Sequence, residues 1–475
     1  MSVLPAPPRS KPAAPSSVLK PAGSVNAQVT PPRFAPATPP PFEPLMLIVQ
    51  AYVFLYVSRS VEFLLPASLR PMLVMGLVLF TVAAISSKIA VVWNSKIYQF
   101  LVFFVGWMAL SIPFGAWPGG SFPIFMDVGK IMIFVMITSA FGVPLDRWFK
   151  IATAVTLASG FVAILAVFGG SNVADRATAL SGGTLSDPNF TALFILTGLP
   201  LVWALGKTGS PFTKIFSIGL SLLMFWGIIR TGSRSALVAL AGLLLVLLIM
   251  LPSRQKIRLA VISCALAVGF GALAPSNVKV RFLTLLSGSG TGEQEDLTRS
   301  TAEDSTEGRR QLLMQSIRLT FRHPILGVGP GNFMNSENNL AQAQGLRKGQ
   351  WHDTHNMYTQ VSSEMGIPGL IFFAGALIIA FRRVSAIRKM NVPASNVNLV
   401  KAKAWALYMQ CALTAIAIDG FFLSVAYSGP YWTALALVIG FEVSVARELA
   451  MAAPEASVQP ASPLSRFIYS RSEKS

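Results

Sequence analysis

Charged side chains are scarce in this sequence: Asp, Glu, Lys and Arg make up 12% of its 475 residues, whereas hydrophobic residues make up 53%. Soluble globular domains carry roughly 25% charged residues. A soluble bundle of buried helices would need a polar surface that this composition does not supply. Apolar runs of about 20 residues, the length that crosses a bilayer, recur along most of the chain. The sequence therefore predicts an all-α polytopic membrane protein.

Cysteine and histidine are also rare. The two cysteines, Cys264 and Cys411, lie within apolar runs, which favours small packing residues and implies no disulfide framework. The three histidines, His323, His352 and His355, all fall in one long polar segment. That segment is where acid–base chemistry is expected.

Composition divides the chain into five regions. Thirteen of the 32 prolines fall in residues 1–44, which predicts a disordered tail because this composition cannot pack a core. Nine spans are expected in residues 45–274 and three in 366–446; the polar segment 275–365 separates them and a second tail, 447–475, follows. The twelve spans are expected near 45–64, 71–87, 98–115, 124–142, 151–169, 189–206, 213–229, 235–251, 258–274, 366–381, 403–422 and 431–446.

Lysine and arginine predict the orientation. If the N-terminus is inside, the inner segments hold most of the basic residues and the short outer loops hold few. This asymmetry places both termini in the cytoplasm and the segment 275–365 outside. The formal net charge of +18 is then a topology signal and an attraction to anionic lipid, and it does not indicate nucleic-acid binding.

Ionisable residues inside apolar spans are candidates for function, because each costs about 2.5–3.5 kcal/mol at the centre of a membrane helix. Asp127 and Lys130 stand i,i+3 in the fourth span, and Asp419 lies in the eleventh. A local ion pair near a helix end explains the first two residues. A polar cavity open to the outside explains them equally well, and in that case Asp127 and Lys130 bind substrate.

The sequence IIRTGSRSALVAL (228–240) joins the seventh and eighth spans. Thr-Gly-Ser interrupts the helix, and Ser233 is suited to cap the next one. Arg234 then stands in the first turn, where a cation is unfavourable beside the positive end of the helix dipole. Free N–H groups and a guanidinium together suit an anion such as phosphate. The alternative is an arginine that reaches lipid headgroups, which is the preferred interpretation for Arg230.

Two further motifs have mainly structural interpretations. In SDPNF (186–190), Asp187 is expected to cap a helix that starts at Pro188, and Asn189 either serves this structure or faces the cavity. GVGPGNF (327–333) lacks the Lys-Ser/Thr of a phosphate-binding loop. Its glycines predict a turn-rich link that lets backbone segments pass closely.

The histidine segment allows three interpretations. His352 and His355 have a possible metal-ligand spacing, but no HExxH motif or cysteine pair accompanies them. A histidine hydrogen-bonded within a folded loop is the second. The third is a general base, because a neutral imidazole with an ordinary pKa of about 6.5 accepts a proton from a hydroxyl. His355 is followed by Asn356, and Glu364 lies just before the chain re-enters the membrane, so all three are candidates for a site at the outer face.

Four motifs in this order resemble the O-antigen ligase and polymerase superfamily. They are SDPNF, RTGSRSALVAL, GRRQLLMQSIRLTFRHPILGVGPGNF (308–333) and HDTHNMYTQVSSEMGIPGL (352–370). The resemblance covers residues 180–375; the outer spans agree only in hydropathy, and the Pro-rich tail is not typical of the family. It implies a lipid-linked glycosyltransferase, of GT-C-like architecture with twelve spans and one large periplasmic loop, in the bacterial inner membrane.

The resemblance also implies a reaction. A glycan moves from undecaprenyl pyrophosphate to a hydroxyl acceptor, either another glycan or lipid A-core, without a metal or nucleotide sugar. By position, Arg234 and Arg309 match arginines that bind the pyrophosphate, and His355 matches the base; Arg310 is an alternative to Arg309. Other polysaccharide-assembly proteins are further expected partners. A multi-span transporter and a non-catalytic assembly component are the alternative functions.

Overall fold

The computed structural model describes residues 43–61, 70–86, 88–173, 176–273, 293–345 and 349–452. The expected N-terminal tail, all but its last residues, lies outside the described residues, as do residues 274–292 of the polar segment and residues 453–475. The described residues from Pro44 onward belong to one compact unit. They are almost entirely helical, apart from a short antiparallel pairing of β1 (Asn172–Val173) with β2 (Arg176–Ala177).

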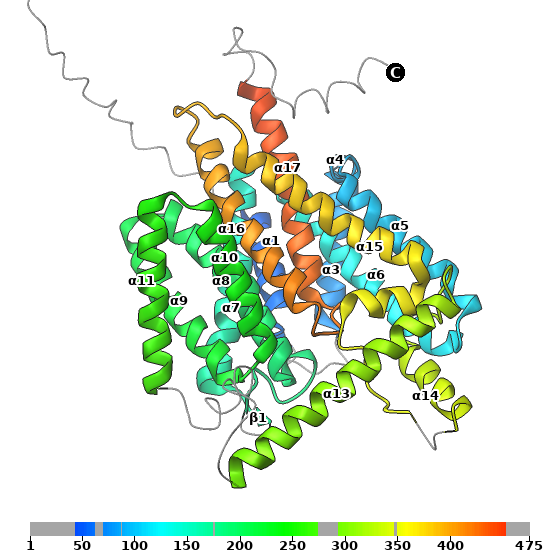
Figure 1. Ribbon diagram of the computed structural model, residues 1–475. Helices are drawn as coiled ribbons and strands as arrows, with labels where there is room; N and C mark the ends of the chain where they lie inside the picture. The colour runs from blue at the N-terminus through cyan, green and yellow to red at the C-terminus, as the bar shows by residue number, and fades with distance from the viewer. Residues whose placement is uncertain are drawn as a thin grey trace, which may run out of the picture. The chain divides into compact units, whose positions relative to one another are not determined.

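A helix lies at each of the twelve expected span positions (Figure 1). Their bounds are α1 (Pro44–Ser58), α3 (Pro71–Ile85), α5 (Lys96–Ser111), α6 (Pro118–Phe141), α7 (Leu145–Ile164), α8 (Pro188–Thr208), α9 (Pro211–Thr231), α10 (Arg234–Met250), α11 (Ser253–Leu273), α15 (Met357–Lys389), α16 (Val397–Asp419) and α17 (Gly429–Ala452). Within the described residues, six of them (α5 to α9 and α15, the first and third with their short extensions) are long and apolar enough to cross a membrane. The chain is a helical, multi-pass membrane protein.

The start of α15 differs from expectation. Hydropathy predicted a span from residue 366, but the helix begins at Met357 and kinks at Gly366, whose φ is 69°. The first part contains buried polar residues that hydropathy scores against a span, including Ser362 and Ser363. Their hydroxyls are hydrogen-bonded, Ser363 to the Thr359 carbonyl at 2.7 Å and Ser362 to a hydroxyl on α13 (Glu293–Arg322) at 2.8 Å. Because these polar groups are hydrogen-bonded, the helix can begin at Met357, before the apolar run starts.

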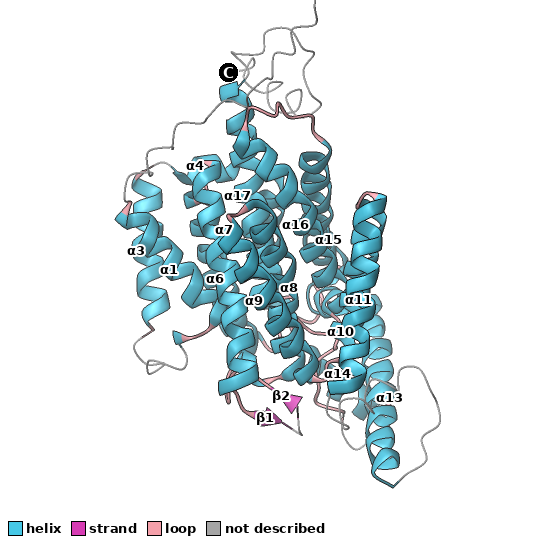
Figure 2. Cartoon of the chain, turned by 90° about the vertical axis from the view of Figure 1, so that its left-hand side faces the viewer, coloured by secondary structure: helices cyan, strands magenta, loops and turns pink. Residues whose placement is uncertain are grey.

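The long polar segment forms two helices, α13 and α14 (Phe333–Ala343). The helix expected over Arg309–Phe321 is confirmed; it begins earlier and ends at Arg322, before Pro324. Figure 1 shows α13 crossing one end of the upright helices obliquely, and Figure 2 shows it reaching beyond that end. A small apolar cluster joins the two helices and the turn between them; its buried members are Leu312, Leu319, Val328, Phe333 and Leu340.

The glycine-rich link 327–333 is confirmed as a close-packed turn. Gly327, Gly329 and Gly331 have φ values of 68°, 94° and 71°. The N–H groups of Val328 and Gly329 donate to the carbonyls of Ser363 and Glu364 at 2.9 and 2.8 Å. A Cβ added at Gly327 would lie 2.2 Å from the Glu364 carbonyl carbon. The turn therefore fixes α13 and α14 against the kinked start of α15.

A buried aromatic cluster joins α7, α16 and α17. The Trp148 ring stacks on Phe441 at a centroid distance of 4.3 Å and meets Trp405 edge-on at 5.4 Å. The Trp148 indole N–H donates to the Leu437 carbonyl at 2.8 Å. Polar groups within a membrane protein need such internal partners because the hydrocarbon offers none. These contacts pack α7, α16 and α17 against one another.

Candidate functional site

The starts of α8 and α10 are capped as expected and are tied together. The Asp187 carboxylate accepts from the N–H groups of Asn189 and Phe190 at 2.7 and 3.0 Å, and Ser233 caps α10. Arg176 bridges the two breaks: its Nε donates to the Thr231 carbonyl at 2.8 Å and its Nη2 to the Asn189 side chain at 2.7 Å. The Asn189 amide oxygen thus serves this bridge, which the sequence did not reveal.

His355 lies in a tight turn just before α15. Its φ is 51°, a left-handed conformation that costs a residue with a Cβ roughly 1–2 kcal/mol. Its N–H donates to the Ser424 hydroxyl at 2.9 Å, and Thr354 also bonds that hydroxyl at 3.0 Å. The Asn356 side chain caps α15 and donates to the Phe421 carbonyl at 3.3 Å. The strained turn is thereby attached to the loop after α16, which fixes the place of the imidazole.

Charges from two distant segments and from the neighbouring His352 act on His355. Burial, followed by the positive charges of Arg309 and His352, lowers the pKa of His355 from 6.5 to about 4, while Asp187 acts in the opposite direction. Arg309 comes from α13 and Asp187 from the start of α8. The fold therefore brings Arg309, Asp187 and His355 into electrostatic contact, and the imidazole is neutral at pH 7.

Asp419, at the end of α16, is a further member of this cluster. The residue has 0% relative exposure, and neither carboxylate oxygen has a hydrogen-bond partner among the described residues. The charge of Arg309 acts on this carboxylate, and the Ser235 hydroxyl adjoins it. The Met357 N–H donates to the Gly420 carbonyl at 2.7 Å, so the end of α16 touches the start of α15. The sequence indicated Asp419 as a functional candidate because it is an acidic residue within an apolar span.

The other arginines occupy different positions. Arg234 is half-buried at the first position of α10 and precedes Ser235, whose hydroxyl adjoins Asp419. Arg310 points elsewhere: its side chain is 73% exposed and pairs with Glu307 at 3.4 Å. The structure thus places Arg309, and not its neighbour, close to His355. Arg230 is half-buried in the last turn of α9, where a cation is favourable for the helix dipole.

The chain was compared with models of known protein families. Residues 219–374 match the family model described as O-Antigen ligase. This part of the chain is an O-antigen ligase domain. Arg234, Arg309 and His355 all lie within it. No curated protein matches the chain. The family implies a membrane enzyme that transfers glycans.

Residues outside the O-antigen ligase domain also contribute. Asp187 and Asn189 precede it, and Asp419 follows it. The cluster therefore needs α8 and α16 as well as the matched residues. The matched segment supplies the arginines and the histidine, and the flanking helices supply the acidic groups around them.

Asp127 and Lys130 form an ion pair at 2.7 Å on α6, with side chains 62% and 47% exposed. They line a cavity of about 590 Å³ together with Arg59, Arg70 and Tyr427. Both interpretations of this pair, an ion pair and a polar cavity, are thus present in the structure. Thr184, which belongs to the loop leading to Asp187, also lines the cavity, so the cavity borders the loop that reaches His355.

Glu364 has internal partners. The residue is 3% exposed, and its carboxylate accepts from the Gly331 N–H at 2.9 Å and from the Tyr427 hydroxyl at 2.7 Å. Asn356 is similarly engaged, since its amide caps α15 and binds the next loop. These contacts favour positioning roles for Glu364 and Asn356 over direct contact with a substrate.

Proposed function

We propose that this chain transfers a glycan from undecaprenyl pyrophosphate to a hydroxyl acceptor, as an O-antigen ligase or as an O-antigen or exopolysaccharide polymerase. The observation that carries the proposal is the electrostatic contact between His355 and Arg309, residues from two separate elements of an O-antigen ligase domain. A base and a cation at one place suit a reaction that removes a proton and releases a diphosphate.

Arg309 and Arg234 are assigned to the diphosphate. Guanidinium groups bind phosphate oxygens in a bidentate manner and keep their charge in every environment. Arg234 stands at the start of α10, where the positive end of the helix dipole also favours an anion. As the bond between the anomeric carbon and the diphosphate breaks, negative charge grows on the leaving oxygen, and both cations stabilise it. The negative charge of the Asp419 carboxylate favours Arg309 at this position, since the two groups interact electrostatically.

His355 is assigned to the acceptor. Its imidazole takes the hydroxyl proton while the hydroxyl oxygen attacks the anomeric carbon and undecaprenyl pyrophosphate leaves. A pKa of about 4 makes the free imidazole a weak base. A diphosphate bound beside Arg309 offsets the positive charge that lowers this pKa, so donor binding raises the pKa of His355 toward neutrality. The base is then strengthened only when the donor is present.

The cavity at Asp127 and Lys130 is assigned to the carbohydrate or headgroup part of a substrate. Its mixed charges and Tyr427 offer hydrogen bonds to hydroxyl groups, and it borders the loop before Asp187. We further propose twelve spans of GT-C-like architecture in the bacterial inner membrane, with both termini cytoplasmic and the His355 cluster periplasmic. The distribution of lysine and arginine supports this orientation. Other polysaccharide-assembly proteins remain proposed partners.

The test is glycan transfer by purified protein with a lipid-linked donor, comparing wild type with His355→Ala, Arg234→Ala and Arg309→Ala. Loss of a general base costs typically 10²–10⁴-fold in rate. Near-native transfer by the His355 variant, in protein of normal expression and folding, would remove the proposed base. Product analysis then separates a ligase, which loads a finished chain on lipid A-core, from a polymerase, which extends chains on the lipid carrier.

A further inference from the structure

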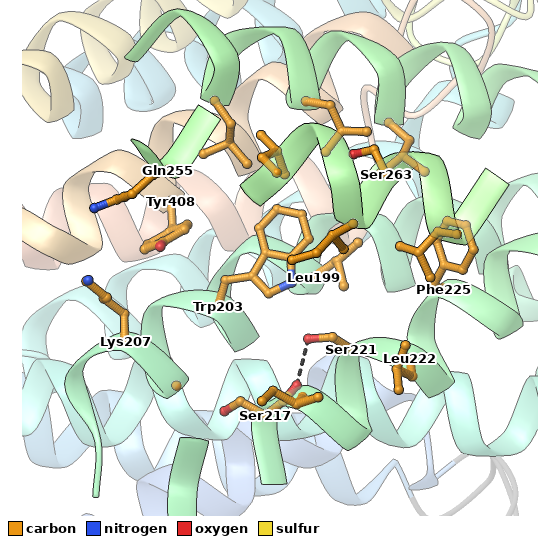
Figure 3. Close-up of a pocket in the computed structure, with 18 of the residues that line it drawn as sticks. Leu199, Trp203, Lys207, Ser217, Ser221, Leu222, Phe225, Gln255, Ser263 and Tyr408 are labelled. Atoms are coloured by element: carbon orange, nitrogen blue, oxygen red, sulfur yellow. Dashed lines mark hydrogen bonds between the residues drawn. The ribbon is translucent and has the colours of Figure 1, made fainter. Parts of the chain in front are cut away.

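A second cavity is mainly apolar. It occupies about 630 Å³ between α8, α9, α10, α11 and α16. Most of its lining is leucine, isoleucine, phenylalanine and tryptophan. Figure 3 shows Trp203, Leu199 and Phe225 along its length, with Lys207 and Gln255 together at one end. This groove therefore has an apolar body and one polar mouth.

The polar mouth is basic. Lys207 lies in the last turn of α8 and Lys214 in the first turn of α9, and both line the groove and are exposed. Gln255, from the first turn of α11, completes the mouth. No acidic side chain lines the groove within the described residues. The opposite end, at Ile229, is where α9 approaches Arg234, so the mouth and the His355 cluster lie at opposite ends of the same helices.

A buried hydroxyl lies deeper in the groove than the lysines. Ser217 is 4% exposed and lines the groove, and its hydroxyl has no hydrogen-bond partner in the part of the chain that the structure describes. The neighbouring Ser221 hydroxyl is satisfied, since it donates to the Ser217 carbonyl at 2.6 Å, the bond drawn in Figure 3. Ser217 lies three residues beyond Lys214 on α9, about 4.5 Å deeper along the helix axis. A buried hydroxyl left unpaired costs roughly 1–3 kcal/mol, which indicates that a ligand supplies its partner.

We propose that this groove is a binding site for one anionic glycerophospholipid. The phosphate pairs with Lys207 and Lys214, an ester carbonyl one step below the phosphate accepts from Ser217, and the acyl chains lie along the apolar walls. From Ser217 to Ile229 the groove follows α9 for roughly 18 Å, comparable with half of a hydrocarbon core of roughly 30 Å. The site therefore fits a lipid of the leaflet at the basic end.

The same features argue against the chain of a polyprenyl phosphate as occupant. That molecule has an anionic head, but only hydrocarbon below it, so Ser217 would stay unpaired. A zwitterionic phospholipid has the esters but no net negative charge for the two lysines. Each lysine near a membrane surface strengthens binding of an anionic partner about fivefold.

The experiment is native mass spectrometry of the full chain in detergent, titrated with phosphatidylglycerol, phosphatidylcholine or undecaprenyl phosphate. Lys207→Ala/Lys214→Ala is expected to lower phosphatidylglycerol affinity about 25-fold. Arg254→Ala/Arg258→Ala is the matched control: both arginines are exposed at the same end of α11, do not line the groove, and are expected to leave affinity within about twofold. Thermal unfolding of each variant checks the fold.

Ser217→Ala separates the lipid classes. The loss of one hydrogen bond predicts about a fivefold weaker affinity for phosphatidylglycerol and no change for undecaprenyl phosphate. Three results would overturn the proposal: equal binding of phosphatidylcholine, equal losses in the two double variants, or phosphatidylglycerol affinity that ignores Ser217→Ala while undecaprenyl phosphate competes for the groove. None of these results depends on glycan transfer, so the proposed function is tested separately.

Discussion

Arg309 and Arg310 are adjacent on α13 and offer a matched pair of substitutions. Arg309 acts electrostatically on both His355 and Asp419. Arg310 is 73% exposed and makes an ion pair with Glu307 at 3.4 Å. Exposed pairs of this kind contribute little, since water and salt screen them. The two variants remove the same charge from the same helix, and only one of them changes the cluster.

The expected effects differ by orders of magnitude. Arg309→Ala removes one stabiliser of the leaving diphosphate, which costs about 10²–10³-fold in kcat. Arg310→Ala changes transfer by no more than about twofold, as for other surface substitutions. Arg309→Ala also removes a positive charge that lowers the pKa of His355, so that pKa rises.

Two measurements check this pair: glycan transfer by the purified variants, and a pH titration of His355 by NMR in each. Circular dichroism and thermal unfolding establish that both variants are folded. Equal activity losses in the two variants would refute the assignment of Arg309. An unchanged His355 titration in Arg309→Ala would show that the two side chains do not interact in the folded protein.

Three further outcomes are expected. In the free protein the pKa of His355 is expected to be about 4 by NMR, so the imidazole stays neutral, and kcat/KM shows no loss from protonation of His355, between pH 7 and pH 5; a midpoint near 6.5 would contradict the burial of His355 beside Arg309. Gly327→Ala lowers unfolding stability by at least about 1–2 kcal/mol, because φ is 68° and the new Cβ meets the Glu364 backbone, whereas Gly271→Ala, in a helix with open space around it, does not; thermal melts compare them. Tyr427→Phe removes a hydrogen bond to the buried Glu364 carboxylate and lowers the melting temperature, which a melt equal to wild type would disprove.

Local signals in the sequence predicted much of the framework. The caps at Asp187 and Ser233, the break before Arg234 and the end of α13 before Pro324 follow from the chemistry of a few neighbouring residues. The glycines of the 327–333 link likewise predicted a close approach of backbones. Such features are encoded within one or two helical turns, which is why they are readable without a structure.

Contacts between residues far apart in the sequence could not be predicted. The sequence assigned the role to Arg309 and left Arg310 as the alternative, because which of the two side chains faces His355 depends on how α13 packs. It assumed an ordinary imidazole, whereas burial and Arg309 lower the pKa of His355. The hydrogen bond from Arg176 to Asn189 joins β2 to the first turn of α8, and no local sequence pattern predicts it. These relations arise only after the chain has folded.

The central claim is that Arg234 and Arg309 act on one diphosphate. A double-mutant cycle in kcat/KM tests it most directly, with Arg234→Ala, Arg309→Ala and the double variant assayed on the same lipid-linked donor. The effects of residues that act as a unit are strongly non-additive, so we expect the second substitution to lower kcat/KM far less in the background of the first. Losses that simply multiply would mean that the two arginines act independently, and would contradict the shared site.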